Sequence, residues 1–592
     1  MTALILNSGI GSRMGKITAN NCKCLVEIVD GITLFDIQIK FLLEAGITNF
    51  CITTGHQSER LKHYAKLHYP DVAFTFVHNP LYNKTNYIYS IYLAKDMLDD
   101  DILLLHGDLL FERSILYDAL ASSHSIMVVD GCKPLPSKDF KAIISDDKIS
   151  RVGVDEFGEG ACYAQPMYKL LKSDWNVWLN EISRCCTAGL KNVYAENALN
   201  QISHKINIKP LNINNRICFE IDNMEDLAYG KIMYPQMVSQ QIYDGFDSLI
   251  KISEIVKLTQ SIKPLVICSS WLYSMVDSLP FDKVIFDAFT PNPTLEEVVA
   301  GINLFVAEGC DFIITIGGGS AIDVGKCICI LNSNIQDITL MNNVRCKHLS
   351  IPTTAGTGSE STCFAVIYKN GVKFSVEHQD ILPQYVILDA KFLDSLPMYH
   401  KKSALLDALC QAIESIWAKG ATNESKHYAK QVIKLIMNNF ETYLTGSKEG
   451  AKKMIIAANL AGKAINISKT TAAHAMSYKM TSLYGVAHGH AVAICLPLVW
   501  KHILHIHNEG NESHLKNSLN DIAVAMGAKS FNNSLEVFQN IYKKMELPSP
   551  HSDNKNDLYE LTASVNNQRL ENHPVKINKD ILLNMYSEIL YE

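Results

Sequence analysis

The N-terminal segment carries residues that can bind phosphate groups. Gly9 and Gly11 follow the apolar residues 3–6, and such a loop lets backbone N–H groups approach phosphate oxygens. Arg13 lies within the loop and offers a guanidinium fork, and Lys23 follows at a distance suited to the same phosphates. A glycine-rich turn is also common between a strand and a helix, so the loop alone leaves both interpretations open.

Two aspartates follow apolar segments of the first half. Asp108 comes just after the predicted strand 101–106, and Asp222 ends a second predicted strand that begins near residue 219. Carboxylates at strand ends can share a hard cation, and Mg²⁺ prefers oxygen ligands and suits phosphate chemistry. The two aspartates therefore predict a magnesium site that serves the phosphate loop.

A second glycine-rich turn lies in the second half of the chain. Residues 312–326 indicate a strand, a turn and a helix, and the turn would place a pyrophosphate at the helix N-terminus. Residues 350–360 supply another polar, glycine-rich loop, and Asn292 could contact a ribose. Together these features predict a dinucleotide site, with the residues Asn292, Gly317, Gly318, Gly319, Ser320, Asp323, Thr353, Thr354 and Thr357.

Four polar residues of the C-terminal part could lie close together. Asp407 and Gln411 are four residues apart, so they share one face of a predicted helix. His474 and His488 follow, fourteen residues apart. A single histidine on a helix is more often a hydrogen-bonded core residue than a ligand, so the spacing alone does not decide what these residues do.

The elements that must position these residues follow two patterns. Short apolar runs alternate with amphipathic stretches over about the first 400 residues, which is typical of parallel α/β units. The next hundred or so residues are rich in Ala, Leu, Ile, Lys and Met at helical spacing, which indicates an all-helical domain. We predict an N-terminal α/β domain (1–235), a second α/β domain that binds a dinucleotide (245–398) and an all-α domain (399–592).

The composition excludes some classes of protein. The formal net charge of −7 provides no bulk attraction to nucleic acid or to an anionic membrane. We find no apolar stretch long enough to span a membrane and no basic leader with a cleavage site. The sixteen cysteines are scattered, which favours free thiols in a reducing compartment. We expect a cytoplasmic protein that neither binds nucleic acid nor inserts into a membrane.

The first part of the chain (1–232) resembles the nucleoside-triphosphate transferases, in particular the cytidylyltransferases that activate phosphocholine and related head groups. The resemblance rests on the glycine loop, on Lys23, and on the segments that end in Asp108 and Asp222. It implies a Rossmann-like domain in which Arg13 and Lys23 are catalytic and stabilise the triphosphate of CTP. It also implies that Asp108 and Asp222 hold Mg²⁺. The residues expected at the nucleotide are Leu6, Ser8, Gly9, Gly11, Asn86, Ser90 and Asp108.

The rest of the chain (245–592) resembles the iron-containing (group III) alcohol dehydrogenases. The resemblance rests on the Gly-Gly-Gly-Ser turn and on the patterns around Asp407 and His474. It implies NADH or NADPH at that turn, a homo-oligomer, and Fe²⁺ or Zn²⁺ held by Asp407, His474 and His488. Gln411 stands in the place of the family's remaining histidine. An amide oxygen is a weaker ligand for these metals, so Gln411 either completes the site or leaves three protein ligands with water.

The choice of nicotinamide depends on the end of the second strand of this domain. NAD-preferring folds usually place an acidic residue there to bind the ribose 2′-hydroxyl. This chain has Ser269 instead, which repels no 2′-phosphate. The residue therefore favours NADPH.

The second half is also similar to the phosphonoacetaldehyde reductases within that family. The resemblance implies reduction of phosphonoacetaldehyde to 2-hydroxyethylphosphonate, and coupling of this product with CTP to CMP-2-hydroxyethylphosphonate and pyrophosphate. Lys373 and Lys479 are candidates for binding the phosphonate, although a solvated surface charge explains either lysine equally well. Two alternatives remain: a polyol-phosphate route to a CDP-polyol, and a phosphocholine cytidylyltransferase fused to a non-catalytic dehydrogenase-like module.

Overall fold

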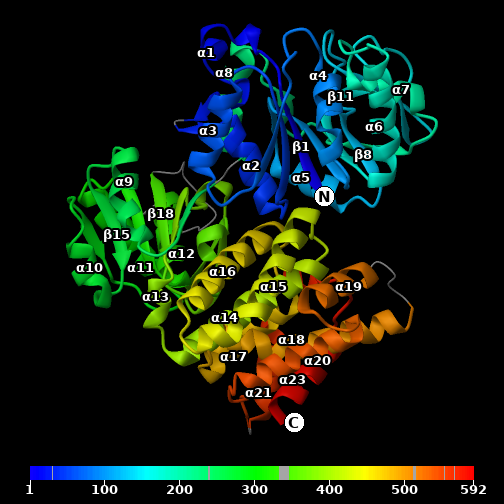
Figure 1. The fold of residues 1–592 in the computed structure, drawn as a ribbon. Coiled ribbons are helices and arrows are strands. Elements are labelled where there is room, and N and C mark those ends of the chain that lie inside the picture. Colours follow the sequence, from blue (N-terminus) through cyan, green and yellow to red (C-terminus); the bar gives the residue numbers. More distant parts are fainter. Residues whose placement is uncertain are drawn as a thin grey trace. The chain divides into compact units, whose positions relative to one another are not determined.

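The computed structural model describes residues 1–29, 31–237, 240–331, 346–510, 515–552, 554–565 and 567–591. The chain divides into two compact units, Met1–Val238 and Ser239–Glu592. Figure 1 shows that each unit combines a β-sheet of its own with helices, and that the C-terminal part of the second unit is helical. The protein is a mixed α/β chain, as predicted.

A nine-stranded sheet organises the first unit. Its strand β1 (Thr2–Asn7) pairs in parallel with β4 (Asn49–Thr54) on one side and with β6 (Ile102–His106) on the other. Alternate residues of β1 belong to separate hydrophobic cores on the two faces of the sheet, which explains why the strand is continuously apolar. β1 thus has a parallel strand on each of its two sides. At such a position the carboxyl ends of the strands, here β1 and β6, form the kind of crevice in which α/β sheets bind ligands.

The remaining elements of this unit extend and cover the sheet. The other strands of the sheet are β5 (Phe74–His78), β8 (Ser125–Asp130), β9 (Lys141–Ser145), β10 (Lys148–Gly153), β11 (Ala161–Leu170) and β12 (Ile208–Asn212). The longer helices are α2 (Leu34–Glu44), α3 (Ser58–His68), α4 (Tyr87–Ala94), α5 (Arg113–Ala121), α6 (Lys172–Thr187), α7 (Ala195–Ile202) and α8 (Met224–Met237).

A separate two-stranded ladder brings distant acidic residues to the crevice. β7 (Leu109–Phe111) pairs antiparallel with β13 (Cys218–Glu220), so that Leu109 lies opposite Glu220. The backbone N–H of Ile221 extends this pairing by donating to the carbonyl of Asp108 at 2.9 Å. The ladder therefore places the segment that ends in Asp222 next to the end of β6.

The second unit begins with a six-stranded parallel sheet in the order β14-β21-β18-β17-β15-β16. β17 (Phe312–Gly317) leads through a glycine turn into α12 (Gly319–Ile330). The edge strand β14 (Gln241–Asp244) pairs with β21 (Tyr385–Leu388), so the sheet begins before residue 245, where we expected the domain to start. Its sequence Gln-Ile-Tyr-Asp is too short and polar to be recognised as a strand.

The other elements of this α/β part flank the same sheet. They are β15 (Pro264–Cys268), β16 (Val284–Phe286), β18 (Lys347–Pro352), the antiparallel pair β19 (Phe364–Lys369) and β20 (Val372–Glu377), α9 (Lys251–Leu258), α10 (Tyr273–Asp277), α11 (Leu295–Ala307) and α13 (Lys391–Asp394).

Helices α14 to α23 form the rest of the second unit. α14 (Met398–Trp417) packs against α15, α16, α18 and α19, and it therefore buries polar side chains as well as apolar ones. The other helices are α15 (Asn423–Leu444), α16 (Lys448–Ser468), α17 (Ala472–Tyr484), α18 (His488–Asn508), α19 (Leu515–Met526), α20 (Phe531–Lys544), α21 (Lys555–Ser564), α22 (Asn567–Glu571) and α23 (Lys579–Tyr591).

The state of the cysteines and the composition of α18 can be compared with the expectations from the sequence. All the cysteines are free thiols, and all except Cys132 are buried. By length and composition, α18 is apolar enough to cross a membrane, and 67% of its most apolar window is buried inside the structure.

Candidate active sites

The first candidate site is a cavity of about 170 Å³ at the carboxyl ends of β1 and β6. Three residues that the sequence analysis did not single out, Tyr82, Tyr87 and His106, also line this cavity. The predicted nucleotide and catalytic residues that line it are Leu6, Ser8, Gly9, Lys23, Asn86 and Asp108.

Lys23 joins the two predicted magnesium ligands. Its ammonium lies 2.5 Å from Oδ2 of Asp108 and also contacts Oδ1 of Asp222. Burial opposes the charge on Asp108 and on Lys23, but their mutual attraction lowers the pKa of Asp108 and raises the pKa of Lys23. The structure therefore brings Lys23, Asp108 and Asp222 together, with the lysine ammonium between the two carboxylates.

Three other predicted residues of this unit, Gly11, Arg13 and Ser90, lie near the cavity but do not line it. Arg13 is largely exposed and its Nη1 lies 2.6 Å from Oδ2 of Asp222. Ser90 is buried, and its hydroxyl donates to the hydroxyl of Ser8 at 2.8 Å. Gly11 has a φ of +70°, which favours glycine at this turn of the loop. Ser90 thus positions the loop through Ser8.

His106 and Glu220 form an additional polar pair that the sequence analysis missed. Nδ1 of His106 lies 2.8 Å from Oε1 of Glu220, and ligand atoms of His106, Asp108 and Glu220 lie within 4.8 Å of one another. Despite burial, the Glu220 carboxylate raises the pKa of His106 to about 9. Burial and the charge of Asp108 raise the pKa of Glu220 to about 6. The sequence did contain a signal for His106 and Glu220, because each lies two residues before a predicted magnesium ligand.

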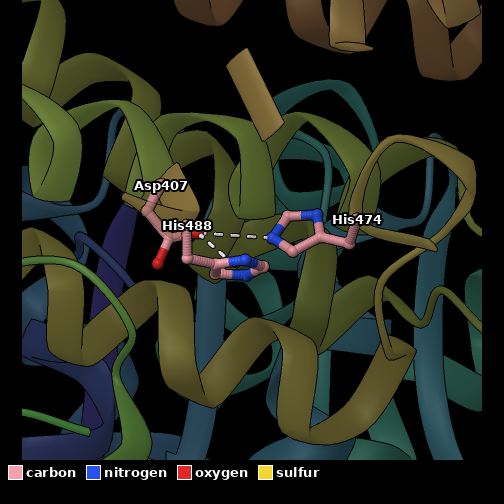
Figure 2. A group of neighbouring side chains, drawn as sticks. All are labelled: Asp407, His474 and His488. Atoms are coloured by element: carbon pink, nitrogen blue, oxygen red, sulfur yellow. Dashed lines mark ion pairs between the residues drawn. The ribbon is translucent and has the colours of Figure 1, made fainter. Parts of the chain in front are cut away.

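Asp407, His474 and His488 form the second candidate site, shown in Figure 2. They come from α14, α17 and the first residue of α18. Oδ1 of Asp407 lies 3.4 Å from Nε2 of His474 and 4.0 Å from Nε2 of His488. One ligand atom of each residue lies within 4.8 Å of the others, which is the spacing that a single divalent metal requires.

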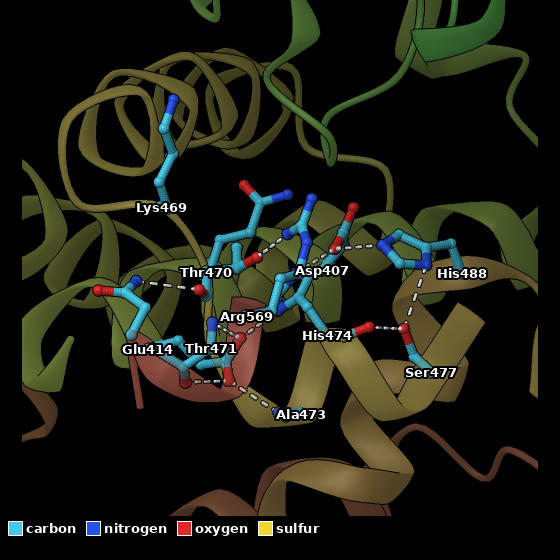
Figure 3. A network of polar contacts seen from close by, with 12 residues as sticks. Asp407, Glu414, Lys469, Thr470, Thr471, Ala473, His474, Ser477, His488 and Arg569 are labelled. Atoms are coloured by element: carbon cyan, nitrogen blue, oxygen red, sulfur yellow. Dashed lines mark hydrogen bonds and ion pairs between the residues drawn. The ribbon is translucent and has the colours of Figure 1, made fainter. Parts of the chain in front are cut away.

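Glu414 orients the first of these histidines. Its carboxylate accepts a hydrogen bond from Nδ1 of His474, so Nε2 of that ring faces Asp407 (Figure 3). The same carboxylate accepts from the hydroxyl of Thr471 at 2.5 Å and from the backbone N–H of Ala473 at 2.9 Å. Despite complete burial, the neighbouring imidazole lowers the pKa of Glu414 to about 2. Carboxylates commonly hold the rings of metal-binding histidines in this way.

Unsatisfied polar atoms at this cluster fit a metal ion. Oδ1 of Asp407, Oε1 of Gln411 and Nε2 of His474 are all buried, and none of the three has a hydrogen-bond partner among the residues that the structure describes. The amide nitrogen of Gln411 donates to the carbonyl of Thr357 at 3.3 Å, which leaves its oxygen available. Buried polar atoms without partners are costly, and coordination by a metal would satisfy them. The donor set of imidazole and oxygen atoms suits Fe²⁺ or Zn²⁺.

Gly489 allows the close approach of two helices that carry ligands. A Cβ at this position would lie 2.1 Å from the backbone oxygen of Ser403 and 2.6 Å from Cβ of Asp407. Only glycine therefore lets α18 pass this close to α14. This contact brings His488 to within reach of Asp407.

The predicted dinucleotide residues divide into two groups. Gly317, Gly318, Thr353 and Thr354 do not line the cavity that contains the metal cluster; instead, the N–H of Thr353 donates to the carbonyl of Gly317 at 3.0 Å. Asp323 accepts from the hydroxyl of Ser359 at 2.6 Å and is half-buried. The predicted residues that line this cavity of about 260 Å³ are Asn292, Gly319, Ser320, Asp323, Thr357, Asp407, Gln411, His474 and His488.

Two predicted phosphonate contacts differ in position. Lys373 lines the cavity and lies over the ring of Tyr478. Lys479 instead forms an ion pair of 2.5 Å with Glu560 and does not line the cavity, which fits the alternative of a surface charge. Successive residues of a helix point in different directions, and Tyr478 takes the position that faces the cavity. Arg569, from the distant helix α22, also lines the cavity and was missed because no local motif surrounds it.

Three segments match known protein families. Residues 239–390 match the iron-containing alcohol dehydrogenases, and residues 402–590 match the C-terminal domain of the same family. Residues 2–130 match the nucleotidyl transferases. The first two segments contain all the residues that line the second candidate site, and the third contains Lys23 and Asp108.

Characterised relatives match the second unit. The lactaldehyde reductase of Escherichia coli (strain K12) is 30% identical over 266 residues, which span 43% of this chain and 68% of that protein. The 1,3-propanediol dehydrogenase of Citrobacter freundii is 31% identical over 293 residues, which span 46% of this chain and 76% of that protein.

Solved structures share the fold of this unit. A 1,3-propanediol oxidoreductase matches with a TM-score of 0.55 and 25% identity, covering 59% of this chain and 97% of that one. The sulfoacetaldehyde reductase from Bifidobacterium kashiwanohense, solved with NAD⁺, matches with a TM-score of 0.55 and 24% identity, covering 60% of this chain and 97% of that one. The chain belongs to the iron-containing alcohol dehydrogenases through its second unit, and it carries a nucleotidyl transferase domain ahead of that unit.

Proposed function

We propose that this protein reduces phosphonoacetaldehyde to 2-hydroxyethylphosphonate with NADPH or NADH, and couples the product to CMP from CTP. The observation that carries the proposal is a shared cavity in the second unit. The Asp407–His474–His488 cluster and the first residues of α12, Gly319 and Ser320, all line it. An aldehyde and a nicotinamide can react only when one cavity holds both in contact. The identity of the phosphonate rests on the resemblance of the two halves to enzymes of phosphonate and phosphocholine chemistry.

In the reductase half, the chain's own residues orient the reactants. Fe²⁺ or Zn²⁺, when held by Asp407, Gln411, His474 and His488, supplies Lewis acidity toward a carbonyl oxygen. The reduced nicotinamide cofactor, when its pyrophosphate is held at the start of α12, would supply a hydride. Glu414 keeps Nε2 of His474 directed at Asp407. The carbonyl carbon gains the hydride and its oxygen gains a proton from water, which gives the alcohol.

In the transferase half, charge neutralisation and positioning do most of the work. A phosphonate oxygen forms a bond to the α-phosphorus of CTP while the bond to the leaving pyrophosphate breaks. Mg²⁺, when held by Asp108 and Asp222, neutralises phosphate charge. It would also replace the Lys23 ammonium as the partner of both carboxylates. Lys23 and Arg13 could then turn toward the phosphate oxygens, where they stabilise developing negative charge.

The second candidate site argues against the alternative of a dehydrogenase-like module without activity. A module that had lost its chemistry would have no need for three buried, unsatisfied ligand atoms on Asp407, Gln411 and His474. Such atoms destabilise a fold unless a ligand satisfies them. Retention of this costly arrangement therefore favours a working metal centre.

A coupled assay on the purified full-length chain tests the proposal. The protein receives phosphonoacetaldehyde, NADPH, CTP and Mg²⁺, and NADPH oxidation and pyrophosphate release are measured separately. We expect both signals, with pyrophosphate release dependent on prior reduction of the aldehyde. Two variants separate the halves. Asp407→Asn should stop NADPH oxidation but leave pyrophosphate release from added 2-hydroxyethylphosphonate intact, and Lys23→Met should have the opposite effect.

Other outcomes distinguish the alternatives. Pyrophosphate release with a polyol phosphate or with phosphocholine, but not with 2-hydroxyethylphosphonate, would contradict the proposed substrate. The absence of NADPH oxidation with any aldehyde, in protein shown to contain metal, would contradict the proposed reductase.

A further inference from the structure

Two basic side chains face the same aromatic ring in the reductase cavity. Nζ of Lys373 lies 2.9 Å from the centroid of the Tyr478 ring, and Cζ of Arg569 lies 5.3 Å from it. All three residues line the cavity. Among the residues that the structure describes, no carboxylate lies within 4.0 Å of either basic group. The end of the cavity around Tyr478 therefore carries positive charge without a paired counter-ion.

This concentration of charge is unfavourable until an anion arrives. Burial lowers the pKa of Lys373 well below its ordinary value, and the neighbouring charge of Arg569 lowers it further. Asp323 attracts Lys373 only from beyond ion-pair distance. An anion bound between the two groups would favour the charged form of Lys373 and offset its repulsion from Arg569. The two basic side chains are therefore complementary in charge to a negatively charged group.

Arg569 is held in place by the wall of the same cavity. Its Nη1 donates a hydrogen bond to the hydroxyl of Thr470, which also lines the cavity. Figure 3 shows Arg569 beside Thr470 in the network that contains Asp407 and His474. A guanidinium restrained in this way keeps its other N–H groups for a ligand and loses little conformational freedom when the ligand binds.

Tyr478 links the basic groups to the metal cluster. Its ring stacks on the imidazole of His488 with a centroid separation of 5.4 Å and an angle of 3°. Two successive ring contacts, of 5.4 Å and 5.3 Å, therefore separate His488 from the guanidinium of Arg569. A ligand with a carbonyl group at the cluster and an anionic group at the arginine would lie along Tyr478.

We infer that Arg569, assisted by Lys373, binds the anionic end of the aldehyde and selects aldehydes that carry a tetrahedral dianion of the phosphonate type. The inference rests on the proposed reductase function and adds the residues that determine its specificity. The N-terminus of α12, where Gly319 and Ser320 line the cavity, would take the phosphates of the nicotinamide cofactor. Arg569 is therefore assigned to the substrate.

Steady-state kinetics of metal-loaded, full-length Arg569→Gln test this assignment. Phosphonoacetaldehyde is compared with uncharged propionaldehyde at saturating NADPH. Loss of a charged hydrogen bond should lower kcat/KM for phosphonoacetaldehyde by about 10- to 100-fold and change kcat/KM for propionaldehyde by less than about threefold. Lys479→Gln is the matched control, because Lys479 pairs with Glu560 and lies outside the cavity lining. Its preference for the phosphonate should equal that of the wild type.

A binding measurement removes the dependence on turnover. Methylphosphonate is titrated calorimetrically into the metal-loaded protein with NAD⁺, and its affinity should fall about 10-fold or more in Arg569→Gln but not in Lys479→Gln. An equal loss of activity with both aldehydes, or a higher KM for NADPH with an unchanged preference between the aldehydes, would overturn the assignment. If the wild type reduces neither aldehyde, the proposed reductase itself fails, and methylphosphonate binding that ignores Arg569 then overturns the inference independently.

Discussion

The carboxylate of Glu414 binds Nδ1 of His474, and this contact directs the opposite nitrogen of the ring toward Asp407. Glu414 is completely buried, and its other hydrogen bonds come from Thr471 and Ala473 at the start of α17. It therefore anchors both the ring of a metal-ligand candidate and the helix that carries it. Because the partner is an anion, the ring is held with its proton on Nδ1, and Nε2 keeps a lone pair for a metal.

Replacement of Glu414 should weaken metal binding without removing a ligand. We expect Glu414→Gln to lower the affinity for Fe²⁺ or Zn²⁺ by about 10- to 100-fold, because the amide no longer fixes the ring or increases its basicity. Competition with a chromophoric chelator measures the affinity directly. Glu588→Gln is a suitable control, since Glu588 is also a carboxylate with one ion pair, to Lys501, on another helix. Equal metal affinities in the two variants would show that Glu414 has only a structural role.

Gln411 should behave as a ligand despite the weakness of amide oxygens. Its Oε1 is buried without a hydrogen-bond partner, one helical turn from Asp407. We expect Gln411→Ala to lower metal affinity by about 10-fold, and Gln411→His to raise the affinity for Zn²⁺ because imidazole suits a borderline metal better. Metal content after dialysis, together with chelator competition, distinguishes these results. An unchanged affinity in both variants would mean that water, and not Gln411, completes the site.

Lys23 should matter for nucleotide transfer and not for aldehyde reduction. Its removal leaves Asp108 and Asp222 facing each other without their cation and removes a positive charge from the phosphate cavity. We expect Lys23→Met to slow pyrophosphate release by about 100- to 1,000-fold, the usual effect of losing one group that stabilises transition-state charge. NADPH oxidation by the same preparation should be unchanged. Lys62→Gln, which breaks an exposed ion pair with Glu59, serves as the control.

Acid should destabilise the second unit through His348. This side chain is buried against the hydroxyl of Thr315 at 2.8 Å, and burial followed by the charge of Lys326 lowers its pKa to about 3. In the unfolded chain the pKa returns to about 6.5. Between these values the unfolded state takes up a proton that the folded state rejects, so the free energy of unfolding falls as the pH falls below about 6.5, by up to about 1.4 kcal/mol per pH unit.

Urea unfolding between pH 5 and pH 8 measures this slope. His348→Gln should be less stable than the wild type at pH 8, because it disturbs a buried contact, but its stability should decline less steeply with acid. His400→Gln, at an exposed position, should keep the slope of the wild type. A variant slope equal to that of the wild type would assign the acid sensitivity to other groups.

Most of the architecture could be predicted because its signals are local. The apolar strands β1, β6 and β17 and the glycine turns after β1 and β17 lie within short stretches of sequence. The helix-forming composition of α14 is equally local. The polar edge strand β14 could not be recognised in this way, since its pairing with β21 depends on a segment much later in the chain.

The sequence by itself determined the two kinds of site and the residue types that each requires, because phosphate turns and metal-binding patterns are written in neighbouring residues. Only the tertiary structure decided which distant groups meet. The β7–β13 ladder brings Asp222 to Asp108, and Lys23 lies between them. The packing of α22 against the cavity adds Arg569, which has no motif around it. Contacts of this kind depend on how elements pack in space, and the spacing of residues along the chain does not contain that information.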